Sequence, residues 1–156
     1  DEERGIENMK DILWWLNSVG IHRKNAAVII GGGAVLDMAG WAVAQHSRGV
    51  KTVIRVPTTS QSQDDSGVAT KYGINFAGKK NKLGGFGAAY GVIIDNYFLK
   101  SQDNRSYRSG LIEIVKVALM KDARFFHFLN ENYESVLRKE FETWEKPQGL
   151  WAAMPR

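Results

Sequence analysis

The sequence contains no cysteine, only three prolines and three histidines, and no apolar run close to the roughly 20 residues of a membrane-spanning helix. Without cysteine, these 156 residues can hold no disulfide framework, thiolate metal site or cysteine nucleophile. The first ten residues, DEERGIENMK, have no signal-peptide or transit character. These absences favour a reducing compartment, and we expect a cytoplasmic protein without a membrane partner.

The composition is that of a folded protein with an excess of basic residues. It is 44% hydrophobic, and the formal net charge is +4 with a pI near 9.3. Such a pI is compatible with nucleic-acid binding when basic residues cluster. Lys71, Lys79, Lys80 and Lys82 do cluster, but only two aromatic residues, Tyr72 and Phe76, lie between them. A small phosphorylated ligand therefore explains the charges better than a nucleic acid does.

The first two thirds of the chain alternate between helix and strand patterns. Residues 6–16 place apolar side chains at helical spacing, and residues 34–46 do the same. Residues 26–30 and 52–56 are short apolar runs, which we interpret as buried strands. Strand, helix and strand in this order form a βαβ unit, which implies a parallel sheet with a right-handed crossover. Residues 91–95 are a candidate for a third strand.

The pattern becomes helical after about residue 100. Helices are predicted over residues 105–120 and 122–137, with Asp122 as a candidate cap. We therefore expect an α/β fold class in two parts. Residues 1–100 form a parallel-sheet, Rossmann-like portion, and residues 101–156 begin an all-α domain.

Residues 57–84 carry few apolar side chains and many polar ones. We interpret this stretch as a long loop that leaves the carboxyl end of a strand, where open α/β sheets bind their ligands. Lysines and backbone amides suit an anionic ligand such as a phosphate. The reactive residues of this stretch are Thr58, Thr59, Asp65, Lys71, Asn75, Lys80 and Asn81.

Three glycines, 31–33, separate the first strand from the helix that follows. Glycines here let backbone amides approach a pyrophosphate at the helix N-terminus. The dinucleotide fingerprint needs a third glycine where this chain has Leu36, so a plain strand-to-helix turn stays open as an alternative. Asp37 suits either interpretation, because it could stabilise the helix N-terminus or bind a ribose hydroxyl.

Residues 111–120 (LIEIVKVALM) hold two charges in an otherwise apolar helix, Glu113 and Lys116. A helix of this composition is expected to be buried nearly all round. The two charged residues are three apart, so they could simply pair with each other. Alternatively they line a polar site, with the carboxylate as a metal ligand or base and the ammonium on an anionic substrate.

Taken in order, these motifs resemble those of the dehydroquinate synthase family of sugar-phosphate cyclases. The matching motifs are GGG-x-x-x-D (31–37), RG (48–49), PTT (57–59), D-x-x-V-x-x-K-x-G-I-N (65–75), K-N-x-x-G (80–84), L-K-S (99–101) and G-L-x-E-x-x-K (110–116). Each motif alone is weak, but their shared order and spacing are specific.

The resemblance implies an NAD-dependent lyase with a divalent metal, zinc or cobalt, acting as a homodimer on a phosphorylated sugar or sugar acid. Such an enzyme oxidises a substrate alcohol transiently, eliminates phosphate, returns the hydride and closes a carbocycle by an intramolecular aldol step. The resemblance favours the 3-dehydroquinate synthase type, with a place in the shikimate pathway of aromatic amino acid biosynthesis.

The resemblance makes residues 1–100 the NAD-binding portion and residues 101–156 the start of the helical domain for metal and substrate, and it also assigns roles to individual residues. The implied NAD contacts are Gly32, Gly33, Asp37, Thr58, Thr59 and Lys80, with Leu99 and Ser101 on the adenine side. The implied catalytic and substrate residues are Lys71, Asn81 and Lys116, with Asp65 between cofactor and substrate. Glu113 is the implied metal ligand. Asp1 and Arg4 align with further residues near the cofactor.

The chain departs from the family pattern in ways that leave its substrate open. Ala69-Thr70 stands for a Gly-Gly pair, Tyr72 for a threonine, and Gly87-Ala88-Ala89 for His-x-Pro. The family's two metal-binding histidines after Glu113 have no counterpart, since His127 lies in no matching motif. We therefore expect an internal or truncated part of such an enzyme. Cyclisation of sedoheptulose 7-phosphate and a noncatalytic nucleotide-binding remnant are the alternatives.

Overall fold

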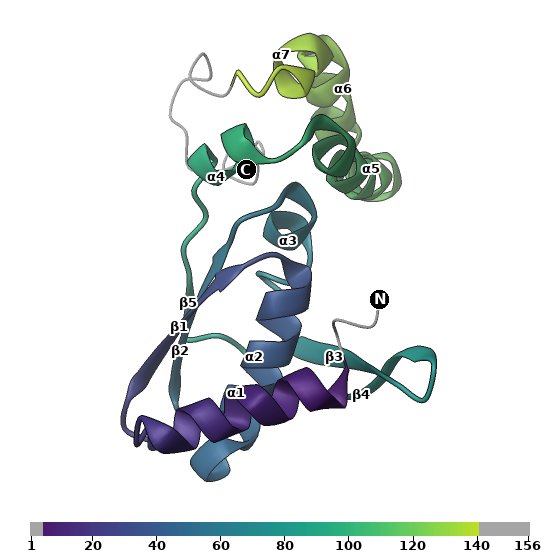
Figure 1. Cartoon of the computed structure of the whole chain (residues 1–156). Coiled ribbons are helices and arrows are strands. Elements are labelled where there is room, and N and C mark those ends of the chain that lie inside the picture. The colour runs from purple at the N-terminus through teal and green to yellow at the C-terminus, as the bar shows by residue number, and fades with distance from the viewer. Residues whose placement is uncertain (1–4, 141–156) are drawn as a thin grey trace.

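A computed structural model describes residues 5–140 (Figure 1); Asp1, Arg4 and the C-terminal residues from Phe141 onward lie outside this range. The α/β part consists of α1 (Ile6–Ser18), β1 (Ala26–Gly31), α2 (Gly33–Gln45), the 3₁₀ turn η2 (His46–Arg48), β2 (Thr52–Pro57), α3 (Ser60–Asp64), β3 (Lys71–Phe76), β4 (Lys79–Phe86) and β5 (Gly91–Val92). The helical part consists of α4 (Tyr97–Ser101), α5 (Asn104–Lys121), α6 (Ala123–Glu131) and α7 (Tyr133–Leu137).

The predicted βαβ unit is confirmed. β1 and β2 pair in parallel from Ala26↔Thr52 to Gly31↔Pro57, so both strands end at the same edge of the sheet. β5 adds a third parallel strand on the other side of β2. It is shorter than the predicted residues 91–95, because the chain turns toward α4, where the Asp95 carboxylate accepts a hydrogen bond from the Tyr97 N–H at 2.8 Å.

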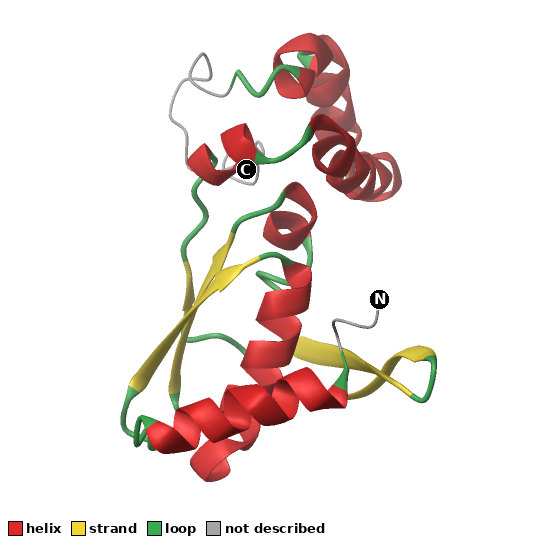
Figure 2. Ribbon diagram, viewed as in Figure 1, coloured by secondary structure: helices red, strands yellow, loops and turns green. Residues whose placement is uncertain are grey.

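The helices α1 and α2 cover one face of this sheet (Figure 2). Ile29 points into that core and is buried, whereas its neighbours Val28 and Ile30 are 57% and 56% exposed. The prediction of a fully buried strand is therefore wrong for β1 within residues 5–140. On α2 the buried apolar residues are Leu36, Ala42 and Val43, whereas Val35 is exposed.

The prediction that residues 57–84 form one long loop is also wrong. This stretch contains the short helix α3 and the antiparallel hairpin β3–β4. Tyr72 and Ile74 alternate toward the α/β core, where they are buried, while Leu83 packs from the partner strand. Ala77 and Gly78 form the connection with positive φ values of 50° and 72°, as a tight hairpin turn requires.

Two helices lie around residues 122–137 where one was predicted. The Asp122 cap is confirmed, because its carboxylate accepts hydrogen bonds from the N–H groups of Arg124 and Phe125 at 3.0 and 3.1 Å. The helix ends at Glu131, and the Asn132 side-chain amide donates to the Phe128 carbonyl at 2.8 Å. Asn132 thus competes for a helical acceptor, which separates α6 from α7.

The helix α5 is not buried all round, contrary to prediction. Ile114 and Ala118 pack in the helical core, but Ile112, Leu119 and Met120 are 68%, 63% and 70% exposed. α5 packs against α3 on one side and α6 on another, and no part of residues 5–140 covers its remaining apolar surface. An apolar composition alone therefore does not predict burial, because a side chain is buried only where another element packs against it.

The short helix α3 joins the two parts of the molecule. Ser60 is fully buried; its hydroxyl donates to the Tyr107 carbonyl at 2.9 Å, and its N–H donates to the Gln102 side chain at 3.0 Å. Burial raises the pKa of the Tyr107 hydroxyl, and the negative charge of Asp64 adds to this, so Tyr107 stays protonated and donates to the Val136 carbonyl at 2.6 Å. The domain boundary near residue 100 stays a prediction. The contact between α3 and α5 crosses it.

Candidate functional site

The glycine turn and the threonine pair meet at the carboxyl edge of the sheet. Gly32 is the N-cap of α2, and the Thr58 N–H donates to the Gly31 carbonyl at 3.0 Å. A Cβ built on Gly32 would lie 3.2 Å from the Thr59 methyl carbon, so the two loops are in close contact. Open α/β sheets bind ligands at this edge, and the N-terminus of the 13-residue helix α2 attracts anions there.

Thr58 and Thr59 form different hydrogen bonds. Thr59 forms a capping box with Ser62: its hydroxyl accepts from the Ser62 N–H at 3.2 Å and donates to the Ser62 hydroxyl at 2.9 Å. The Ser62 hydroxyl in turn accepts from the Thr59 N–H at 3.0 Å. The hydroxyl of Thr59 therefore serves α3 while its methyl group faces Gly32, and half-buried Thr58 contacts the glycine turn through its backbone N–H.

A polar pocket of about 540 Å³ lies beside this edge, between α2, the segment after α3 and the hairpin. Four of the predicted site residues line it: Asp37, Asp65, Lys71 and Asn81. They come from a helix, a helix C-cap and two strands, so only the tertiary fold brings them together. Lysine, asparagine and backbone amides on its walls suit an anion, and the two carboxylates suit hydroxyl groups.

A bulge in the hairpin aims Asn81 at this pocket. The regular pairing of Ile74 with Leu83 shifts before Phe76 pairs with Lys79, which leaves extra residues on β4. Asn81 takes up this irregularity with a φ of 51°, a conformation that asparagine adopts more readily than most residues. Its N–H donates to the Asn75 side chain at 3.1 Å. Bulges next to binding sites commonly redirect a side chain in this way.

The other predicted residues of the hairpin and of α4 lie outside this pocket. Lys80 is exposed and does not line it, whereas its neighbour Lys82, to which the resemblance assigns no role, does. Leu99 is fully buried in the helical core, so only its backbone can face a cofactor. The Ser101 hydroxyl is exposed and donates to the Phe98 carbonyl at 3.0 Å.

Glu113 and Lys116 pair with each other on α5. The Lys116 ammonium donates to the Glu113 carboxylate, and the two side chains are 56% and 42% exposed. Among residues 5–140 no group of three histidine, cysteine, aspartate or glutamate side chains could hold a metal ion. A catalytic zinc site normally needs three protein ligands, so the described residues do not by themselves fit a metal centre.

Sequence reasoning missed Arg55, which lies fully buried in β2 behind the polar pocket. A charged residue in the middle of an apolar strand run, VIRVP, was a signal that could have found it, because charged side chains are almost never fully buried unless paired.

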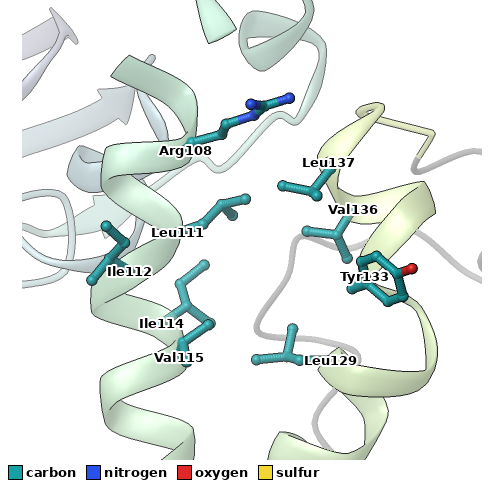
Figure 3. Close-up of a pocket in the computed structure, with 9 residues that line it drawn as sticks. All are labelled: Arg108, Leu111, Ile112, Ile114, Val115, Leu129, Tyr133, Val136 and Leu137. Carbon is teal, nitrogen blue, oxygen red and sulfur yellow. The ribbon is translucent and has the colours of Figure 1, made fainter. Parts of the chain in front are cut away.

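A second cavity, of about 350 Å³, lies between α5 and the pair α6–α7 (Figure 3). Leu111, Ile114, Leu129 and Val136 point toward one another across it, and Arg108 stands at its rim. None of the predicted site residues lines this cavity. Its apolar lining does not suit a phosphate, so the predicted chemistry belongs to the polar pocket.

Comparison with known proteins now places this architecture. The family model of the 3-dehydroquinate synthase N-terminal region matches residues 1–109. The chain belongs to this family. A 3-dehydroquinate synthase from Geotalea uraniireducens (strain Rf4) is 40% identical over 142 residues, which are 91% of this chain and 39% of that protein. The chain therefore spans well under half the length of this curated relative.

Solved structures of cyclases resemble the chain in fold. The 2-epi-5-epi-valiolone synthase ValA from Streptomyces hygroscopicus subsp. jinggangensis 5008, with NAD+ and Zn2+ bound, matches with a TM-score of 0.84 and 31% identity over 96% of this chain and 40% of that one. A 2-deoxy-scyllo-inosose synthase complexed with carbaglucose-6-phosphate, NAD+ and Co2+ matches with a TM-score of 0.68 and 28% identity over 72% of this chain and 31% of that one. The α/β class with a parallel sheet is thereby confirmed for this member of the dehydroquinate synthase family.

Among the described helices of this family member, none is both long and apolar enough to cross a membrane.

Proposed function

We propose that the chain forms the NAD-binding and substrate-binding part of a sugar-phosphate cyclase. The observation that carries this proposal is the carboxyl edge of β1 and β2, where the glycine turn lies in contact with Thr59 and next to the polar pocket. A dinucleotide site and an anion site side by side are what the coupled redox and elimination steps of such an enzyme need.

The residues of the glycine turn fit a dinucleotide. The backbone N–H groups of Gly32 and Gly33 stand at the N-terminus of α2, where a pyrophosphate gains from the helix dipole. Thr58 is joined to the turn by its N–H, which donates to the Gly31 carbonyl, and Asp37 stands one turn into the helix, where a carboxylate can accept a ribose hydroxyl. When bound, NAD supplies the transient hydride acceptor and donor for the substrate alcohol.

The polar pocket would hold the anionic end of the substrate. The Lys71 ammonium and the Asn81 amide can donate to a phosphate or carboxylate, and both line this pocket. The Asp65 carboxylate can accept from a sugar hydroxyl and so orient the ring between the phosphate and the cofactor. No step is assigned to a metal, because among residues 5–140 Glu113 stands alone as a candidate ligand.

We further propose that the reaction is of the 3-dehydroquinate synthase type, with cyclisation of sedoheptulose 7-phosphate as the second candidate. The 40% identity to a 3-dehydroquinate synthase supports the first, and the TM-score of 0.84 to a 2-epi-5-epi-valiolone synthase supports the second. The first substrate is a sugar acid and carries a carboxylate that sedoheptulose 7-phosphate lacks. Product analysis of the whole protein with a sugar-acid phosphate and with sedoheptulose 7-phosphate separates the two, and turnover of neither would favour a noncatalytic remnant.

The first prediction concerns NAD and the 156-residue chain. Titration with NAD should shift the backbone amide signals of Gly32, Gly33 and Thr58 in ¹H–¹⁵N NMR spectra, with weak affinity. Gly32→Ala should weaken binding at least about 10-fold, since a Cβ at this position stands in the way of the pyrophosphate and 3.2 Å from Thr59. Gly91→Ala is the matched control, because its Cβ would meet no atom within 4 Å. Shifts confined to the cavity between α5 and α7 would contradict the assignment.

The second prediction concerns metal and turnover. The 156-residue chain alone should retain no stoichiometric zinc after dialysis and should release no phosphate from either sugar phosphate. The reason is that Glu113 is the only residue that the resemblance offers as a ligand, and it is paired with Lys116. Metal analysis after dialysis and a phosphate-release assay test this. One equivalent of retained zinc, or measurable release, would show that the chain holds more of the metal site than we propose.

A further inference from the structure

Arg55 is a buried cation whose described partners are backbone carbonyls rather than carboxylates. Its side chain has no exposed surface. The Nη1 group donates to the carbonyls of Ser66 at 3.0 Å, Gly67 at 3.5 Å and Ala69, and the Nη2 group donates to the carbonyl of Gly87 at 3.1 Å. Burying a charge is costly unless it is well hydrogen-bonded, so these carbonyls must stay where they are for Arg55 to remain inside.

These carbonyls belong to the two segments that flank the polar pocket. The segment of residues 66–69 links Asp65 to Lys71, and both of these residues line the pocket. Gly87 follows directly after β4, whose residues 81–86 also line the pocket. One planar guanidinium therefore ties both segments to the central strand β2. A lysine ammonium could not do this, because it is a single point rather than a fork with donors on two sides.

The ring of Tyr72 completes this arrangement. The Arg55 guanidinium carbon lies 4.6 Å from the centre of the ring, within the range of a cation–π interaction. A Cβ on Gly40 would lie 2.2 Å from the ring, and one on Gly87 would lie 2.9 Å from it, so the ring fits tightly between α2 and the end of the hairpin. Since Tyr72 follows Lys71 directly, this packing also fixes the start of β3.

We propose that Arg55 is a positioning residue that holds residues 66–69 and Gly87 together and so sets the place of Asp65 and Lys71 in the polar pocket. Its hydrogen bonds end on these two segments and do not reach Gly32 or Gly33. Loss of the fork should therefore disturb the substrate side of the site and spare the NAD side. This inference rests on the proposed cyclase function for its kinetic consequence, but not for its structural one.

The structural consequence is tested without any ligand in the 156-residue chain. Hydrogen–deuterium exchange of the backbone amides of residues 67–72 should be at least about 10-fold faster in Arg55→Gln than in the wild type. The reason is that loss of a hydrogen bond from a charged group shifts the equilibrium for local opening by about this factor. Amides of β1 should exchange at the wild-type rate. Arg105→Gln, which removes an exposed arginine from α5, is the matched control and should change neither. Equal acceleration in both regions, or none in residues 67–72, overturns the proposal.

The kinetic consequence is tested in the whole protein. Arg55→Gln and Arg55→Lys should both raise KM for the sugar phosphate by about 10-fold or more, while Kd for NAD changes by less than about 3-fold. A purely structural role would weaken both ligands together, and an equal rise in KM and Kd overturns the proposal, as does full activity of Arg55→Lys. If the wild-type protein turns over no sugar phosphate, the proposed function fails, and the exchange experiment still decides the role of Arg55.

Discussion

Replacing Lys71 by alanine in the whole protein is expected to lower kcat/KM for the sugar phosphate by about 10-fold to 150-fold. A hydrogen bond to a charged group contributes roughly 1.5–3 kcal/mol, and Lys71 is the lysine that the fold places in the polar pocket with Asp65 and Asn81. Steady-state kinetics of the purified variant measure the effect. Lys80→Ala and Lys116→Ala should also lower kcat/KM, since the resemblance places both in the site.

The structure ranks the lysines of this series and identifies their control. The Lys116 side chain is 56% exposed and paired with Glu113, so the largest loss is expected at Lys71. Lys82 lines the pocket and is therefore not a suitable control. Lys79 stands at the hairpin turn outside the pocket, and Lys79→Ala should change kcat/KM by less than about 3-fold. Equal losses at Lys79 and Lys71 would indicate a diffuse basic surface instead of a defined anion site.

The βαβ unit and the main helices could be predicted because their signals are local. Residues 26–30 and 52–56 are short apolar runs on either side of a helix with its own period, and parallel pairing follows from that order. The hairpin of β3 and β4 escaped prediction because glycine, lysine and asparagine dominate it, and only Tyr72, Ile74 and Leu83 carry its apolar pattern. Counting apolar residues does not reveal a strand pattern that so few residues carry.

Burial was the part of the fold that the sequence could not supply. The residues of β1 and α5 are apolar on nearly every side, which is typical of elements with neighbours on all faces. Within residues 5–140 each has neighbours on part of its surface only, and Val28 and Ile112 are exposed as a result. The chain spans 39% of the length of a curated relative.

Two departures from the family pattern gain a physical meaning from the structure. Tyr72, where a threonine is usual, and Gly87, where a histidine is usual, touch each other, and both contact Arg55. A large ring at residue 72 needs a residue without a side chain at 87, since even a Cβ there would approach the ring to 2.9 Å. The positions were visible in the sequence as separate oddities, but their coupling is a property of the fold.

Replacing Gly110 by alanine is expected to destabilise the 156-residue chain, although helix propensity argues for the opposite. Alanine in place of glycine inside a helix contributes about 1 kcal/mol of stability by itself. At this site in α5, however, a Cβ would lie 2.0 Å from the Ser60 hydroxyl and 2.5 Å from the Gln61 backbone nitrogen. Ser60 cannot give way, because it is fully buried and hydrogen-bonded to Tyr107 and Gln102.

Overpacking typically costs 1–3 kcal/mol, and a 2.0 Å approach to a fixed neighbour belongs at the upper end of that range. After the gain of about 1 kcal/mol from helix propensity, we expect a net loss of about 2 kcal/mol and a Tm lower by about 4–8 °C for a chain of this size. Thermal and urea unfolding followed by circular dichroism measure both quantities. Gly91→Ala is the control, since its Cβ would meet no atom within 4 Å and its stability should stay within about 0.5 kcal/mol of the wild type. A more stable Gly110→Ala variant would mean that propensity alone acts at this position. In that case α3 would not pack closely on α5, and the carboxyl edge of β1 and β2 would not be joined in this way to the helix that carries Glu113 and Lys116.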